Sequence, residues 1–226
     1  MTNNIPVIAV DGPSGVGKGT LCQALANHFN WHLLDSGAIY RVLALSALQQ
    51  NIALDDTKQL ATLALKLPLT FDTSSDNVKI LLDGLDVSRE IRTEETGGAA
   101  SKVASINEVR TALLKRQRDF RQLPGLVADG RDMGTVVFTD ASVKIFLDAS
   151  AHSRAERRMK QLQDKQIHAK FGEILQEITA RDERDRNRAV APLKPAVDAL
   201  IIDTTSLSIQ DVFNQSIMYI KEKLAL

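Results

Sequence analysis

The feature that most constrains the fold is a glycine-rich stretch, GPSGVGKGT, at residues 12–20. The short apolar run before it, 5–10, is rich in β-branched residues and is typical of a buried strand. The residues that follow, 18–27, place their apolar side chains on one side of a predicted helix. A strand, a glycine-rich loop and a helix in this order predict a backbone cradle for a polyphosphate, to which Lys18 adds a positive charge. The alternative is an ordinary strand-to-helix turn, and the lysine in this context argues against it.

The loop differs at one position from the common phosphate-binding pattern, G-x-x-x-x-G-K followed by Ser or Thr. Gly12, Gly17 and Lys18 match the pattern. Gly19 stands where the hydroxyl residue is usual, and a hydroxyl comes one residue later, at Thr20. A phosphate cradle is therefore expected, but the pattern does not identify a residue that contacts a metal ion directly.

Strands and helices alternate along the rest of the chain, which predicts an α/β fold with helices on both faces of a parallel sheet. The expected strands are 5–10, 31–34, 126–129, 143–147 and 199–202. One stretch breaks the alternation, because 69–88 has short β-like runs separated by turn residues. We expect a small antiparallel insert there, at about 68–92.

Several helix starts can be proposed from serine residues. A Ser followed three residues later by an acidic residue has the form of a capping box. Three such pairs occur: Ser105 with Glu108, Ser153 with Glu156, and Ser208 with Asp211. Ser36, after the second expected strand, is also a candidate helix cap.

Polar side chains follow the expected strands, where ligands gather in parallel α/β sheets. Ser36 and Arg41 follow the second strand, and their alternative interpretation is a cap with a surface arginine. Asp129 ends the third strand, where a carboxylate associated with Mg²⁺ lies in P-loop proteins. Arg131 and Asp132 come next between glycines, and a turn with an internal ion pair is the alternative there.

Two arginine-rich segments come after the fourth strand. The first contains Arg154, Arg157 and Arg158, and the second is RDERDRNR at 181–188. Helical spacing puts Arg181, Asp185 and Arg188 on one face and pairs Asp182 with Arg186 on another. A solvated mixed-charge face is the common interpretation of such a pattern. Beside a phosphate cradle, the same arginines are what a lid over a transferring phosphoryl group needs.

Composition narrows the class of protein. Lys+Arg and Asp+Glu are both 28, so no net field favours nucleic acid or an anionic membrane as a partner. The apolar stretches are far below the roughly 20 residues of a membrane span, and the start of the chain has no signal-peptide pattern. The single cysteine, Cys22, excludes an internal disulfide and fits a reducing compartment. We expect a cytoplasmic protein, and the 4% aromatic content favours a monomer.

Taken together, five stretches resemble the bacterial cytidylate kinases, a branch of the nucleoside monophosphate kinases, over essentially the whole chain: DGPSGVGKGT, LLDSGAIYR, ADGRDMGTVVF, KIFLDAS and RDERDRNRAVAPL. Members of this group have Gly-Lys-Gly-Thr in the loop, which accounts for Gly19. The resemblance implies a P-loop NTPase fold with a five-stranded parallel sheet, a small β insert and a helical lid. It implies one kinase domain, 1–226, with its core at about 1–67 and 93–226, the insert at about 68–92 and the lid at about 151–170.

The implied reaction is transfer of the ATP γ-phosphoryl group to CMP or dCMP, giving ADP and CDP or dCDP, in pyrimidine nucleotide metabolism. The implied catalytic residues are Lys18, Arg131, Arg158 and Arg188. ATP would be bound by Gly12, Pro13, Ser14, Gly15, Val16, Gly17, Lys18, Gly19, Thr20 and Arg157. CMP would be bound by Ser36, Arg41, Ser101, Arg110, Asp132, Arg181, Asp185 and Arg188. The Mg²⁺ that accompanies ATP would be held by phosphates and water, with Thr20 and Asp129 nearby.

Two other classes of protein are alternatives to a nucleoside monophosphate kinase. A GTP-driven switch should carry an Asn-Lys-x-Asp guanine-binding motif, and the sequence has none. A P-loop kinase for a metabolite that is not a nucleotide would need neither the cytosine-reading residues nor the β insert.

Overall fold

The computed structural model describes residues 5–72, 79–164 and 166–225. The chain forms two compact units. Unit 1 comprises Met1–Leu34 and Arg118–Leu226, and unit 2 comprises Asp35–Gln117.

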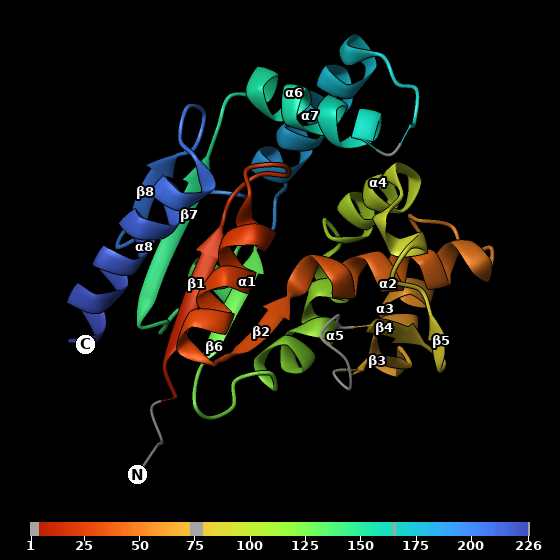
Figure 1. Cartoon of the computed structure of the whole chain (residues 1–226). Helices are drawn as coiled ribbons and strands as arrows, with labels where there is room; N and C mark the ends of the chain where they lie inside the picture. Colours follow the sequence, from red (N-terminus) through yellow and green to blue (C-terminus); the bar gives the residue numbers. More distant parts are fainter. Residues whose placement is uncertain (1–4, 73–78, 165, 226) are drawn as a thin grey trace. The chain divides into compact units, whose positions relative to one another are not determined.

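Unit 1 is built on a five-stranded sheet with the order β2-β6-β1-β7-β8 (Figure 1). Its strands are β1 (Val7–Asp11), β2 (His32–Asp35), β6 (Leu126–Gly130), β7 (Val143–Asp148) and β8 (Leu200–Asp203). The central strand β1 pairs in parallel with β6 and with β7, and β7 pairs in parallel with β8. The predicted parallel sheet is therefore confirmed, and each of its strands overlaps the expected range.

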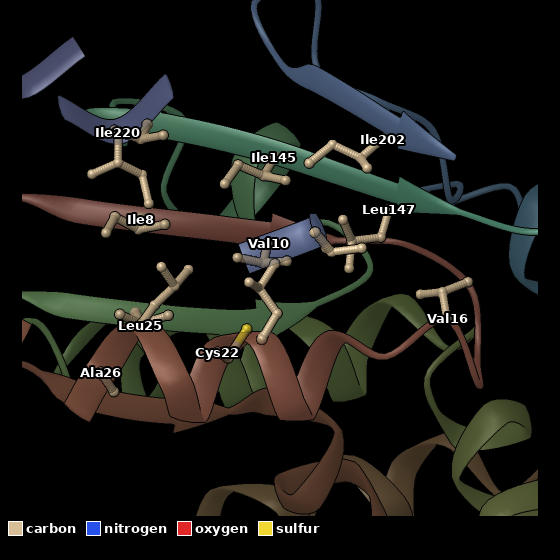
Figure 2. Packing of buried hydrophobic residues seen from close by; sticks show 14 of the residues in the cluster. Ile8, Val10, Val16, Cys22, Leu25, Ala26, Ile145, Leu147, Ile202 and Ile220 are labelled. Atoms are coloured by element: carbon tan, nitrogen blue, oxygen red, sulfur yellow. The ribbon is translucent and has the colours of Figure 1, made fainter. Parts of the chain in front are cut away.

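Helices α1 (Lys18–Phe29) and α8 (Ile209–Leu224) pack on one face of this sheet. Successive residues of a strand point to opposite faces, so Ile8 and Val10 lie on the same face. Figure 2 shows these two side chains against Leu25 of α1 and Ile220 of α8, all of them buried. Val7 and Ala9 point to the other face and are also fully buried, so both faces of β1 are covered.

A one-turn π-helix, η2 (Met133–Val137), follows β6 and contacts both β1 and β6. After β7 comes a helical hairpin of α6 (Ala151–Asp164) and α7 (Phe171–Asn187). Ala155, Leu162 and Ile174 form a small apolar cluster of this hairpin, separate from the core under the sheet. The hairpin is the part of the chain in which the lid was expected.

Unit 2 combines helices with a small antiparallel sheet. Its elements are α2 (Ser36–Gln49), α3 (Thr57–Lys66), β3 (Leu69–Asp72), β4 (Lys79–Leu82), β5 (Leu85–Asp86), η1 (Glu90–Arg92), α4 (Glu94–Val103) and α5 (Asn107–Arg118), whose last residue belongs to unit 1. β4 pairs antiparallel with β3 and with β5, which confirms the expected insert. Residues 73–78 of the expected insert lie outside the described residues.

The helix caps follow the serine pattern only once. Ser208 and Asp211 form the predicted capping box at the start of α8. The other two boxes are wrong: the Ser105 hydroxyl donates to the Lys102 carbonyl, and the Ser153 N–H donates to Ser150. Asp35, not Ser36, caps α2, since its carboxylate accepts from the Ala38 N–H at 3.0 Å.

Within the described residues, no helix has the length and apolar character that crossing a membrane requires.

Candidate active site

The glycine-rich loop 12–20 joins β1 to α1, and three of its glycines have positive φ. Gly12 has φ of 150°, and a Cβ built there would lie 2.1 Å from the carbonyl oxygen of Leu147. Gly17, with φ of 95°, is the N-cap of α1 in the left-handed region. The sequence therefore needs glycine at both positions to bring the loop close to β7 and to open the helix N-terminus toward an anion.

Lys18 begins α1 and is only 6% exposed. Its ammonium donates to the Pro13 carbonyl at 2.9 Å and lies 3.9 Å from the Asp129 carboxylate. Burial and then the charges of Arg131 and Arg181 lower the pKa of Lys18 to about 8, against the opposing charge of Asp129. The lysine charge is thus held at the loop, close to two arginines.

Asp129 faces the glycine-rich loop at Gly19, the position where a hydroxyl residue is usual. A Cβ at Gly19 would lie 3.7 Å from the Asp129 carboxylate. An oxygen ligand beside a phosphate cradle suits a Mg²⁺ ion that keeps several of its waters. The described residues contain no group of three or more His, Cys, Asp or Glu side chains that could hold a metal, so they offer no all-protein cage. Thr20 is exposed on the first turn of α1.

Arg131 follows β6 and forms an ion pair with Asp185 of α7, with 2.9 Å between Nε and Oδ2. Asp185 is buried, yet Arg131 and Arg181 outweigh the effect of burial and lower the pKa of its carboxyl group. The carboxylate is therefore charged at neutral pH and can hold guanidinium groups in place.

Asp132 is also buried and lies 3.7 Å from the Arg188 guanidinium. Arg188 is the C-cap of α7 and has an extended backbone. The prediction that Arg181, Asp185 and Arg188 share one helix face is therefore wrong for Arg188, which lies outside the helix. Arg181 reaches the loop, where it lies 3.5 Å from the Ser14 hydroxyl. The strand ends and α7 thus bring together the predicted residues Lys18, Asp129, Arg131, Asp132, Arg181, Asp185 and Arg188.

Arg154 has a position that sequence patterns did not reveal. It is 2% exposed and donates to the carbonyl oxygens of Ser14 and Ala149 and to the Asp182 carboxylate. The predicted pair of Asp182 with Arg186 is therefore wrong, and Arg186 pairs instead with Asp148. Arg154 ties the glycine-rich loop to α7, and both partners are distant in the sequence.

Arg157 and Arg158, on the same helix α6, are both partly buried. Arg157 donates to the Thr204 carbonyl, to the Thr204 hydroxyl at 3.2 Å and to the Thr205 carbonyl at 3.4 Å. In this structure it is bound to the loop after β8.

Asp11, the last residue of β1, is a further buried residue that the sequence analysis did not single out. Its two carboxylate oxygens accept the backbone N–H groups of Met133 and Gly134, each at 2.8 Å. The only sequence signal is an acidic residue between an apolar strand and the first glycine of the loop.

Unit 2 holds the other predicted site residues. Arg41 of α2 donates to the Ile91 carbonyl at 2.7 Å, and a Cβ at Gly97 would lie 3.1 Å from its guanidinium. Arg110 of α5 is buried, donates to the Ala104 carbonyl at 3.1 Å and lies over the ring of Tyr40. Ser36 and Ser101, at the start of α2 and in α4, are buried as well.

The chain is similar to known proteins along its whole length. A family model described as Cytidylate kinase matches residues 8–222. A protein named Cytidylate kinase from Klebsiella pneumoniae (strain 342) is 59% identical over 225 residues, covering 100% of this chain and 99% of the relative. One of the same name from Aeromonas salmonicida (strain A449) is 60% identical over 224 residues, covering 99% and 97%. Another, from Escherichia coli (strain K12 / DH10B), is 58% identical over 226 residues and covers both chains completely.

Proposed function

Because the chain belongs to the cytidylate kinase family, we propose that it transfers the γ-phosphoryl group of ATP to CMP or dCMP, giving ADP and CDP or dCDP in pyrimidine nucleotide metabolism. The observation that carries the proposal is the buried Lys18 at the end of the glycine-rich loop, where α1 begins, with the charges of Arg131 and Arg181 close enough to help lower its pKa. Cations held out of water at one point serve to bind and stabilise a highly charged phosphoryl group.

The loop would bind the donor. In this proposal the backbone N–H groups of 12–20 bind the ATP phosphates, and Lys18 contacts the phosphoryl group that is transferred. The left-handed glycines support this assignment because they leave the loop backbone without side chains. Arg157 is assigned to ATP as the family resemblance implies, and its contact with Thr204 supports this, because the Thr204 hydroxyl donates to the Val16 carbonyl of the loop.

The arginines would stabilise the charge of the reaction. An oxygen of the CMP phosphate attacks the γ-phosphorus while the bond to the ADP oxygen breaks, and negative charge spreads over the equatorial oxygens. We assign Arg131, Arg188 and Arg158 to that charge, since planar guanidinium forks fit phosphate oxygens in pairs. Asp185 and Asp132 hold two of these arginines before substrate arrives.

The acceptor nucleotide would be bound by the residues that the family resemblance implies. We assign Ser36, Arg41, Ser101, Arg110, Asp132, Arg181, Asp185 and Arg188 to CMP. The cytosine ring offers an amino donor at C4 and acceptors at N3 and O2. Hydroxyl and carboxylate oxygens and a buried arginine have the complementary polarity.

The donor set also fits a magnesium ion. Asp129 and Thr20 would hold it, through water, beside the phosphates. When bound, the ion neutralises charge on the β- and γ-phosphate oxygens. We further propose that the protein acts in the cytoplasm, as a monomer, with no nucleic acid or membrane as partner.

The test is a coupled assay of ADP formation with ATP, Mg²⁺ and a panel of CMP, dCMP, UMP, AMP and GMP. We expect turnover with CMP and dCMP, and these two nucleotides should also raise the melting temperature most, because they bind the folded state. If none of the five nucleoside monophosphates is phosphorylated, the proposal is contradicted, and a kinase for a metabolite of another class is favoured.

A further inference from the structure

The segment that carries Arg131 and Asp132 is anchored by a carboxylate outside the assigned site. Asp11 ends β1, and strand alternation places its side chain on the face of Val7 and Ala9, opposite α1 and α8. On that face η2 contacts β1. Asp11 is 5% exposed, and its Oδ1 and Oδ2 accept from the N–H groups of Met133 and Gly134 at 2.8 Å each.

The far end of η2 is held in a complementary way. Arg118 donates from Nε to the Val137 carbonyl at 3.0 Å, and from Nη2 to the Val136 carbonyl at 3.4 Å. A helical turn leaves N–H groups at its start and carbonyl groups at its end without partners inside the turn. In η2 the Asp11 carboxylate accepts from N–H groups at the start of the turn, and the Arg118 guanidinium donates to carbonyl groups at its end.

We propose that Asp11 is a positioning residue for phosphoryl transfer, which fixes the backbone directly after Asp132 and thereby the directions of the Arg131 and Asp132 side chains. This proposal rests on the proposed function. The register supports it, because Asp11 of β1 lies beside Gly130 of β6, the residue before Arg131. The Asp11 carboxylate thus connects the start of the glycine-rich loop with the segment that carries Arg131 and Asp132.

A carboxylate is specifically suited to this contact. It offers two acceptor oxygens to two backbone donors, whereas the amide of Asn offers one oxygen and turns an N–H toward the second donor. Asp11→Asn keeps the size of the side chain and removes one of the two bonds. We expect the backbone after Asp132 to shift, and a displacement of about 1 Å at a catalytic group lowers turnover by roughly 10²-fold.

The experiment measures kcat and the KM values for ATP and CMP for the wild type, for Asp11→Asn and for two controls. Asp140→Asn makes the same chemical change at an exposed carboxylate paired with Arg121. Val212→Ala removes buried volume from the core cluster far along the chain, on α8, and lowers stability without touching the segment. For Asp11→Asn we expect kcat to fall by about 10- to 100-fold with both KM values within about threefold of wild type. Both controls should keep kcat within about twofold.

A folded Asp11→Asn protein with wild-type kcat would overturn the positioning role, as would an equal loss of kcat in Val212→Ala at the same loss of melting temperature. If Asp11→Asn does not fold, Arg118→Ala provides the test, because it removes the exposed guanidinium that holds the far end of η2. The same fall in kcat with unchanged KM values is expected, and an unchanged kcat would overturn the proposal. A wild type without CMP phosphorylation would instead overturn the proposed function, and the positioning role would fall with it.

Discussion

At the scale of single residues, Lys18 is the side chain on which the proposed chemistry depends most. Its ammonium is buried and held to the Pro13 carbonyl, so it is organised before ATP binds. We expect Lys18→Ala to lower kcat by roughly 10²-fold or more, as the loss of a preorganised charge does. Binding of CMP, measured by calorimetry, should change much less. A folded variant with near-normal turnover would contradict the role of Lys18.

The lowered pKa of Lys18 gives a second residue-scale prediction. Since burial and the nearby arginines lower this pKa to about 8, the free protein loses the lysine proton as the pH rises through that value. We expect kcat/KM for ATP to fall on the alkaline side with an apparent pKa near 8, because kcat/KM reports the groups of the free enzyme. The measurement is a pH profile of kcat/KM for ATP from 6 to 10 at a CMP concentration well below its KM, and a flat profile through pH 9 would contradict the prediction.

In the proposed function, we expect base selectivity to depend on two buried side chains of unit 2, Ser101 and Arg110. Uracil reverses the polarity that cytosine shows at position 4 and N3, so a site that fits cytosine leaves facing donors and facing acceptors with UMP. Such buried mismatches discriminate by the order of 10²-fold. We expect Arg110→Met and Ser101→Ala to lower the ratio of kcat/KM for CMP over UMP, whereas the neighbouring exposed Lys102→Ala should not. Ratios that agree within about twofold in all four proteins would exclude these residues as base readers.

At the scale of elements, α4 contains two adjacent glycines with different surroundings. A Cβ at Gly97 would lie 3.1 Å from the Arg41 guanidinium, whereas one at Gly98 meets nothing within 4 Å. Gly97→Ala requires the Arg41 guanidinium, which donates to the Ile91 carbonyl, to shift by a few tenths of an ångström, so we expect it to raise KM for CMP. Gly98→Ala should leave KM unchanged and stabilise the helix by about 0.5–1 kcal/mol. Equal KM values for both variants would show that Arg41 does not bind the acceptor.

Elements also show how far the sequence alone could lead. The sheet strands and the antiparallel insert were predictable because β-branched runs and turn residues are local signals, and the strand ends brought most of the site with them. The caps at Ser105 and Ser153 were wrong because Ser-x-x-Glu spacing does not establish where a helix begins. The role of Asp11 was not identified, since its partners are backbone N–H groups far along the chain, which no side-chain pattern marks. Arg154 was noted only as one arginine of a rich segment, because its contacts with the Ser14 carbonyl and Asp182 depend on the folded chain.

At the scale of the whole molecule, the prediction concerns assembly. The exposed large apolar residues of the described chain lie mostly apart in the sequence, as in Leu65, Leu123 and Met218, and aromatic residues make up only 4% of the chain. Stable interfaces are enriched in aromatic side chains at their centre. We expect a monomer of 24.8 kDa in sedimentation velocity across a hundredfold range of concentration. A dimer that does not dissociate on dilution would contradict this.

The pairing of β1 has a consequence for the order in which the protein is made. Its two neighbours, β6 and β7, begin at Leu126 and Val143, so β1 has no partner in the sheet until translation has passed Leu126. Unit 2, in contrast, is continuous in the sequence and is synthesised completely within that interval. The nascent chain therefore carries an unpaired apolar strand, Val7–Asp11, through the synthesis of an entire compact unit. Late pairing of this kind slows folding and leaves the edges of the strand open to aggregation until β6 and β7 have been made.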